Sequence, residues 1–180
     1  MHLVTGLAKT DHDTIQVTKN GCGPIIGLTP IKVGLTEDWA ERCSRFNQAA
    51  FQIIVGTDSV THVVLASEFS GYFKNSDEQS FLVPEGVVKK DRSRAVEAMI
   101  ATIESLKDAG KIPILFSPPP RSGFNMGECL ERNETGLVSF RGQCDVLVED
   151  YMAYDREIIS GLKYIESKTS VKVIWLDDML

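Results

Sequence analysis

Histidine is scarce in this sequence, and its cysteines are not spaced as metal ligands usually are. The three histidines, His2, His12 and His62, stand far apart, and none of the four cysteines forms a Cys-x-x-Cys pair. Structural zinc sites take four closely spaced ligands of these types, so a metal site is not expected. No glycine-rich loop leads from a predicted strand into a helix, so a phosphate-bearing cofactor is not expected either.

Clusters of positive charge and long apolar runs are also missing. The chain has 19 Lys and Arg against 25 Asp and Glu, a net charge of -6, which argues against a nucleic acid as partner. No apolar run approaches the ~20 residues that cross a bilayer, and the first residues lack the basic start and apolar stretch of a signal peptide. Taken alone, the chain is expected to be soluble.

What is present is the composition of an ordinary folded domain. Hydrophobic residues make up 43% of the 180 residues, enough for a single domain with a core over residues 1–180. Apolar runs at 62–66, 112–116 and 171–176 predict buried strands, and 15–17 a brief one. Helical periodicity predicts long helices at 36–56, 91–109 and 145–168 and a short helix at 3–9. This alternation predicts an α/β fold with a parallel, doubly wound sheet.

Local signals define the ends and faces of the helices. Thr36 and Asp91 are suited to N-caps, and Gly56 and Gly110 stand where helices end. Residues 75–86 are polar and irregular, which predicts a surface loop or lid. The expected apolar faces are Trp39, Cys43, Phe46, Ala50 and Ile53 in the first long helix, Val96, Met99, Ile103 and Leu106 in the second, and Leu147, Tyr151, Ile158, Leu162 and Ile165 in the third.

The loop after residues 112–116 is the expected wall of a site. Three prolines, Pro118 to Pro120, end the strand, and ligands of open α/β sheets bind beyond the carboxyl ends of the strands. Ser67 follows the strand 62–66, where its hydroxyl and a backbone N–H suit an oxyanion. Arg121 follows the prolines and suits an anionic or sugar substrate. Both residues are equally compatible with plain surface positions.

No serine–histidine–aspartate arrangement is evident. The segment Val55-Gly-Thr-Asp-Ser59 resembles a nucleophile turn, but it lies between a helix and a strand, whereas a nucleophile elbow joins a strand to a helix. His62 opens a predicted strand, which favours a structural histidine over a catalytic one. We therefore assign no catalytic residue.

The spacing of the cysteines favours two local disulfides, Cys22–Cys43 and Cys129–Cys144. Each closes a loop of about 15 to 20 residues, which is worth roughly 3 kcal/mol in the chain-entropy model. Disulfides imply an oxidising compartment, to which a larger parent chain would have to carry this domain. Four reduced cysteines in a cytosolic protein remain the alternative.

Several segments, taken in order, resemble the SGNH-type domain of bacterial acyltransferase family 3 membrane O-acetylases. They are Asn20-Gly-Cys-Gly-Pro24, Cys43-Ser-Arg-Phe-Asn47, Val63-Val-Leu-Ala-Ser67, Phe116-Ser-Pro-Pro-Pro-Arg-Ser-Gly-Phe124 and Glu128-Cys-Leu130. The resemblance implies a three-layer, flavodoxin-like α/β/α sheet outside the cytoplasm, fused to a membrane-embedded acyltransferase domain. It implies transfer of an acyl group, usually acetyl, to a hydroxyl of a cell-envelope glycan. Gly21 and Ser67 would lie near the oxyanion hole, and the same two disulfides would form.

The resemblance also places the family's catalytic groups outside these residues. Its nucleophilic serine would precede the helix that begins at His2, and its Asp-x-x-His would follow Asp177. We therefore expect a partial domain that lacks the central first strand of the sheet and is inactive alone. A non-catalytic glycan-binding module of the same fold and an unrelated cytosolic flavodoxin-like protein are the alternatives.

Overall fold

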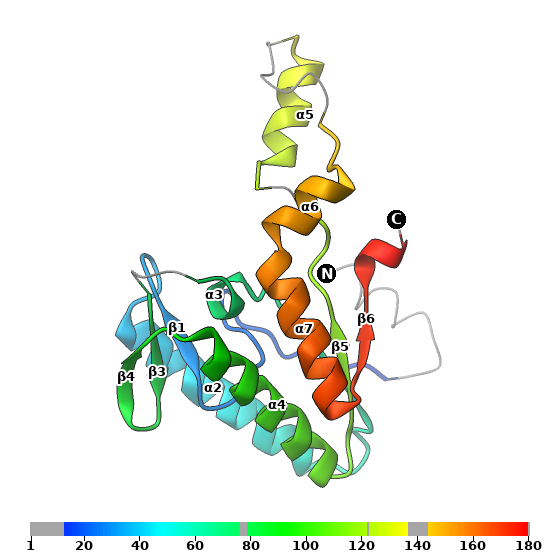
Figure 1. Cartoon of the computed structure of the whole chain (residues 1–180). Coiled ribbons are helices and arrows are strands. Elements are labelled where there is room, and N and C mark those ends of the chain that lie inside the picture. Colours follow the sequence, from blue (N-terminus) through cyan, green and yellow to red (C-terminus); the bar gives the residue numbers. More distant parts are fainter. Residues whose placement is uncertain (1–12, 76–78, 122, 137–143, 180) are drawn as a thin grey trace.

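The computed structural model describes residues 13–75, 79–121, 123–136 and 144–179 (Figure 1). The helix predicted at 3–9 lies outside these residues. The described chain forms two three-stranded sheets, one parallel and one antiparallel, with helices packed against them. The predicted α/β class with a parallel sheet is confirmed.

The parallel sheet contains the three buried strands that the sequence predicts. Its strands are β2 (His62–Ala66), β5 (Ile112–Phe116) and β6 (Lys172–Ile174), in the order β2-β5-β6. Leu65 pairs with Leu115, and Leu115 pairs with Val173, so three apolar side chains lie in one row across the sheet. Because the strands are parallel, all three carboxyl ends meet at one edge.

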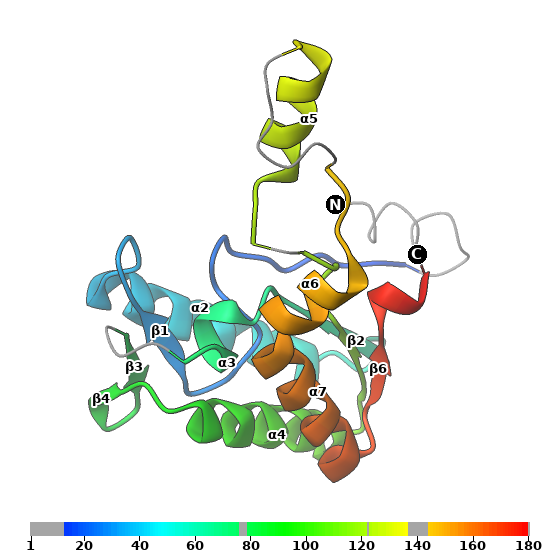
Figure 2. The same ribbon diagram turned by 45° about the horizontal axis from the view of Figure 1, so that its top comes forward.

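Helices α4 (Arg92–Asp108) and α7 (Arg156–Thr169) pack on each other and on the strands β5 and β6 (Figure 2). Their inward side chains join the strands and the stacked pair Phe69 and Phe73 in one hydrophobic core. Side chains on the opposite face of the sheet are more open in the described structure, with Val64 37% and Ile112 52% exposed. The core members from these helices are Ala95, Val96, Met99, Ile103, Leu106, Ile158, Leu162 and Ile165.

The antiparallel sheet corrects the sequence prediction of a loop or lid over 75–86. Strands β1 (Thr29–Ile31), β3 (Ser80–Val83) and β4 (Gly86–Lys89) pair in the order β1-β3-β4. Alternation in β3 buries Phe81 and Val83, and this two-residue period is too short to stand out among polar neighbours. Helix α2 (Glu37–Val55) packs against β1 and β3.

The N-caps of the two long helices are as predicted, but the buried face of α2 is as predicted only in part. Thr36 accepts a hydrogen bond from Trp39 N, and Asp91 accepts one from Ser93 N. In α2 the buried residues are Ala40, Cys43 and Asn47, whereas Ile53 is 63% exposed. The face is rotated because Cys43 and Asn47 bind the preceding loop, as described below.

Further predictions near the two ends of the described chain need correction. Residues 15–17 form no strand, and Ile15 is 72% exposed. The helix expected at 145–168 is two helices, α6 (Val148–Tyr154) and α7, which join at Asp155. Leu147, expected on its apolar face, is 51% exposed. A short 3-10 helix, η1 (Leu176–Met179), follows β6, which ends earlier than predicted.

Both predicted disulfides, Cys22–Cys43 and Cys129–Cys144, are present. The first joins the N-terminal loop to α2 in the body of the fold. The second begins on α5 (Met126–Glu134), which projects from the body in both views (Figures 1 and 2). Among the described residues, none from α5 belongs to the central hydrophobic core.

Within the described ranges, the structure has no helix with both the length and the apolar character that crossing a membrane requires.

The two disulfides are expected to contribute unequally to the stability of the body. Replacing Cys22 and Cys43 together by alanine should lower the free energy of unfolding by about 3 kcal/mol, because the loop they close is packed into the fold. The matched replacement of Cys129 and Cys144 should change it by less than about 1 kcal/mol, because the projecting segment opens on its own. Urea unfolding followed by the fluorescence of Trp39 and Trp175, both in the body, measures this difference. Equal losses in the two variants would contradict it.

Candidate functional site

The carboxyl edge of the parallel sheet carries the polar residues that the sequence marks as a site. Ser67 follows β2, and Ser117 and the proline loop follow β5. The proline loop turns Arg121 back toward the end of β2, where its Nη2 donates to the Glu68 carbonyl oxygen at 3.3 Å. The structure therefore brings Ser67 and Arg121 to one place, as expected for strands that run side by side.

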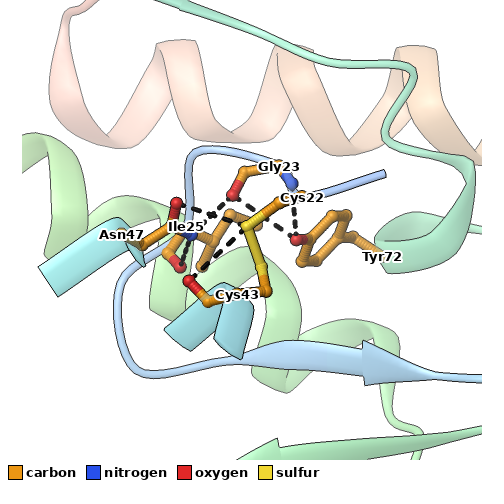
Figure 3. The surroundings of a disulfide bond; sticks show 6 residues. All are labelled: Cys22, Gly23, Ile25, Cys43, Asn47 and Tyr72. Atoms are coloured by element: carbon orange, nitrogen blue, oxygen red, sulfur yellow. Dashed lines mark hydrogen bonds between the residues drawn. A yellow bond between two sulfur atoms is a disulfide. The ribbon is translucent and has the colours of Figure 1, made fainter. Parts of the chain in front are cut away.

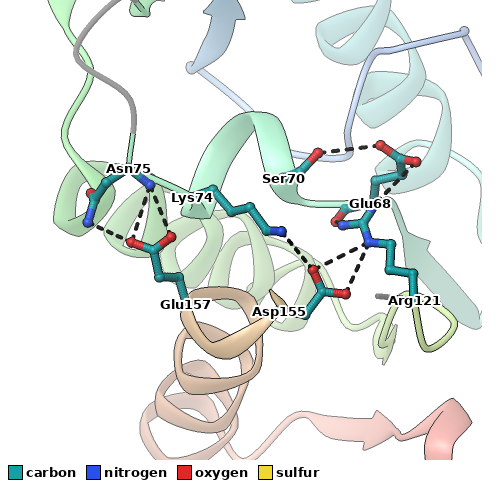
Figure 4. Close-up of polar contacts among 7 residues, drawn as sticks. All are labelled: Glu68, Ser70, Lys74, Asn75, Arg121, Asp155 and Glu157. Carbon is teal, nitrogen blue, oxygen red and sulfur yellow. Dashed lines mark hydrogen bonds and ion pairs between the residues drawn. The ribbon is translucent and has the colours of Figure 1, made fainter. Parts of the chain in front are cut away.

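Arg121 is held in that position by a carboxylate with no exposed surface. Its Nε donates to both carboxylate oxygens of Asp155, at 3.0 and 3.3 Å. Lys74, at the end of α3 (Ser70–Phe73), reaches the same carboxylate at 3.0 Å (Figure 4). Lys74 also lies over the ring of Tyr154, 3.3 Å from the ring centre. The negative charge of Asp155 is thus neutralised by two cations from two different loops.

A second carboxylate, that of Glu68, contacts the outer side of Arg121. Its Oε1 lies 3.3 Å from Arg121 Nη1, and the Glu68 side chain is 76% exposed. Partial burial works to lower the pKa of Arg121, but the hydrogen bonds and charge of Asp155, together with Glu68, outweigh it and raise that pKa. The guanidinium is therefore a permanent cation at this edge.

The backbone after Ser67 is strained. Phe69 has φ of 55°, in the left-handed region, although it is bulky and fully buried. Its N–H donates to Ser67 Oγ at 3.4 Å, so the half-exposed Ser67 hydroxyl lies at the start of a tight turn. Such strain, which costs of order 1–3 kcal/mol, clusters at functional sites.

Ser117 has a structural role. It is buried, its N–H donates to the Ile174 carbonyl at 3.0 Å, and its Oγ accepts from Leu176 N at 2.9 Å. Ser117 therefore joins the ends of β5 and β6 and leaves Ser67 as the more accessible hydroxyl.

The turn containing Gly21 is fixed by three separate contacts (Figure 3). The disulfide anchors Cys22 to α2, and the Asn47 amide donates to the carbonyls of Gly23 and Ile25 at 2.8 and 3.2 Å. The Tyr72 hydroxyl accepts from Gly23 N at 3.0 Å. Burial raises the pKa of the Tyr72 phenol, against the hydrogen bond from Gly23 that works to lower it.

Glycine is required at both positions beside Cys22. Gly21 has φ of +73°, and a Cβ at Gly23 would lie 2.6 Å from the Tyr72 ring. Tyr72 belongs to α3, the helix that follows Ser67, so α3 connects the Gly21 turn to the site around Arg121.

Two buried polar atoms near this edge lack hydrogen-bond partners in the described structure, Tyr151 Oη and Asp177 Oδ1. Burial raises the pKa of Tyr151 to about 12, and the charges of Asp177, Asp155 and Asp178 add to the effect. Tyr151 therefore remains a neutral phenol at physiological pH.

His62 lies at the opposite end of the sheet from Ser67. It begins β2, is exposed, and its Nδ1 lies 3.0 Å from the Thr61 hydroxyl. Five residues of strand separate it from Ser67 by roughly 16 Å. The Val55–Ser59 turn lies at that same amino end. In the described part of the chain, no group of three or more His, Cys, Asp or Glu side chains is arranged to hold a metal ion.

Sequence reasoning missed five residues that build the site, Asn47, Glu68, Tyr72, Lys74 and Asp155. Two of them left a detectable signal. Asn47 follows Cys43 by four residues on the buried side of α2, and Asp155 follows Tyr151 by four on an apolar face. A polar residue in an apolar helical stripe indicates a buried polar contact. Glu68, Tyr72 and Lys74 carry no such signal.

The fold and this edge define an α/β domain with a polar site at the carboxyl ends of a parallel sheet. The family model described as "SGNH domain (fused to AT3 domains)" matches residues 1–180. The chain therefore belongs to this family, and the resemblance found in the sequence is confirmed. Family membership and the two disulfides support a domain of acyl-transfer or hydrolase-like type associated with a membrane acyltransferase. None of the curated proteins compared with the chain matches it.

The Tyr72 hydroxyl is expected to stabilise the Gly21 turn. Tyr72→Phe leaves the buried Gly23 N–H without its acceptor and should lower the free energy of unfolding by about 1–3 kcal/mol. Tyr164→Phe, which removes the hydroxyl of a half-exposed tyrosine on α7, should change it by less than about 0.5 kcal/mol. Denaturant unfolding of the two variants provides the test. A Tyr72→Phe protein as stable as the control would show that this hydrogen bond contributes nothing.

The buried Asp155 carboxylate is expected to contribute more to the free energy of unfolding than an exposed carboxylate in an ion pair. Asp155→Asn leaves Arg121 and Lys74 without their buried counter-charge and should cost about 3 kcal/mol. The same replacement at Asp38, whose carboxylate pairs with Arg42 on the exposed side of α2, should cost less than about 1 kcal/mol. Chemical denaturation at neutral pH measures both. Similar effects at the two positions would refute the assignment.

Proposed function

We propose that this chain is part of an O-acyltransferase that acts on cell-envelope polysaccharide, in which the carboxyl edge of the sheet receives the sugar hydroxyl. The acyl group, acetyl in this proposal, would come from a membrane-embedded acyltransferase domain of the parent protein. The observation that carries the proposal is the family match over residues 1–180. The convergence of Ser67 and Arg121 at one edge supports it, and the two disulfides support a periplasmic location.

Within this proposal, Ser67 contributes an oxyanion donor. Its Oγ accepts from Phe69 N, which leaves the hydroxyl hydrogen free to donate to a developing oxyanion. Gly21 has the supporting position that the family resemblance gives it, on a turn fixed by Tyr72 and the Cys22–Cys43 disulfide.

The isolated 180 residues are proposed to be inactive as an esterase. His62, the histidine in the described residues, lies at the far end of β2 and is not available to Ser67. A non-catalytic glycan-binding module remains the second candidate, because a domain that only binds glycan needs no histidine beside Ser67. The two candidates differ in whether acyl transfer depends on Ser67.

The decisive measurement is the acetyl content of the polysaccharide in cells that make this domain fused to its membrane acyltransferase. Ser67→Ala should lower acetyl transfer by about 100-fold, the effect of losing one oxyanion donor. Ser105→Ala, an exposed position on α4, is the matched control and should leave transfer unchanged. The isolated chain should hydrolyse p-nitrophenyl acetate no faster than buffer. Full acetylation with Ser67→Ala would favour the binding module, and fast hydrolysis by the isolated chain would refute inactivity.

A further inference from the structure

The exposed carboxylate of Glu68 is bound at both of its oxygens. Arg121 Nη1 lies 3.3 Å from Oε1, and the Ser70 hydroxyl donates to Oε2 at 3.4 Å (Figure 4). These two groups come from different segments, the proline loop and the start of α3. Together they form a small cradle shaped for one carboxylate.

The position of Arg121 in the cradle does not depend on the Glu68 side chain. Arg121 is fixed by two hydrogen bonds to Asp155, which is completely buried, and by its contact with the Glu68 backbone carbonyl. None of these contacts involves the Glu68 side chain. If that side chain rotates away, Arg121 keeps its place and its Nη1 faces solvent.

Among the four residues joined by ion pairs, the charges balance only while Glu68 is in place. Lys74 and Arg121 carry two positive charges, and Asp155 and Glu68 carry two negative charges. Departure of the Glu68 side chain leaves Lys74, Arg121 and Asp155 with one net positive charge. An exposed ion pair of this kind is weak, so exchange of Glu68 for an external carboxylate costs little.

We propose that the cradle formed by Arg121 and Ser70 binds a carboxylate of an acidic saccharide, and that Glu68 occupies it when no ligand is present. This inference rests on the proposed function and names its acceptor class: a glycan that contains uronic acid residues. The sugar carboxylate would bind Arg121 Nη1 and the Ser70 hydroxyl, close to Ser67 and therefore to the hydroxyl to be acylated. No covalent step occurs in the cradle itself.

Calorimetric titration of the 180-residue chain with two trisaccharides tests the inference. The ligands are an α-1,4-linked galacturonic acid trisaccharide and the galactose trisaccharide of the same linkage, which differ only at the carboxylate. The acidic ligand should bind more tightly than the neutral one, and added salt should weaken its binding. Equal binding of the two trisaccharides, or no binding of either, would overturn the inference.

Variants of the cradle test whether the Glu68 side chain competes with the ligand for Arg121 or has no part in binding. Glu68→Gln should tighten binding of the acidic ligand by about two- to fivefold, the equivalent of one exposed ion pair. Glu128→Gln, at the exposed Glu128–Arg132 pair on α5, is the matched control and should have no effect. Ser70→Ala should weaken binding of the acidic ligand. Arg121→Lys should weaken it as well, although this variant keeps a positive charge beside Asp155. Unchanged or weaker binding by Glu68→Gln would refute the displacement.

The binding assay involves no acyl transfer, so it separates the two proposals. If acetyl transfer depends on Ser67 but no acidic saccharide binds, the acceptor class alone is wrong. If the acidic saccharide binds but acetyl transfer does not depend on Ser67, the carboxylate site is supported and the catalytic role of Ser67 is refuted.

Discussion

The edge of the sheet depends on one buried charge. Asp155 has no exposed surface, and an ionised carboxylate without water costs several kcal/mol unless cations replace the solvent. Arg121 and Lys74 supply them from the loop after β5 and from the end of α3. Because the two cations must both reach one carboxylate, the loops beyond β2 and β5 are held together where the strands end.

A second set of contacts holds the same region from the other side. The turn at Gly21 is joined to α2 by the Cys22–Cys43 disulfide and by Asn47, and to α3 by Tyr72. Helix α3 has four residues and is far too short to be stable by itself. Tyr72 within α3 and Lys74 directly after it fix the helix to the N-terminal loop and to Asp155. Phe69, in its left-handed conformation, is the residue directly before this helix.

Sequence reasoning recovered what local patterns determine and missed what long-range contacts determine. The caps at Thr36 and Asp91 and the strand 112–116 follow from neighbouring residues alone. The strand β3 was missed because two buried side chains, Phe81 and Val83, are too few to define a period. The break at Asp155 was missed because helix periodicity continues through it. At the break, Asp155 contacts Arg121 and Lys74, which are distant in sequence and become neighbours only in the fold.

The two carboxylates that contact Arg121 show how burial separates a structural role from an exchangeable one. Asp155 and Glu68 carry the same charge and lie at similar distances from the guanidinium. Asp155 has no access to water, so losing its partners would leave a bare charge in the interior, and the contact persists. Glu68 is mostly exposed, so water solvates it whenever it leaves. Arg121 can therefore remain fixed in the fold while its outer face changes partner, as the proposed carboxylate site requires.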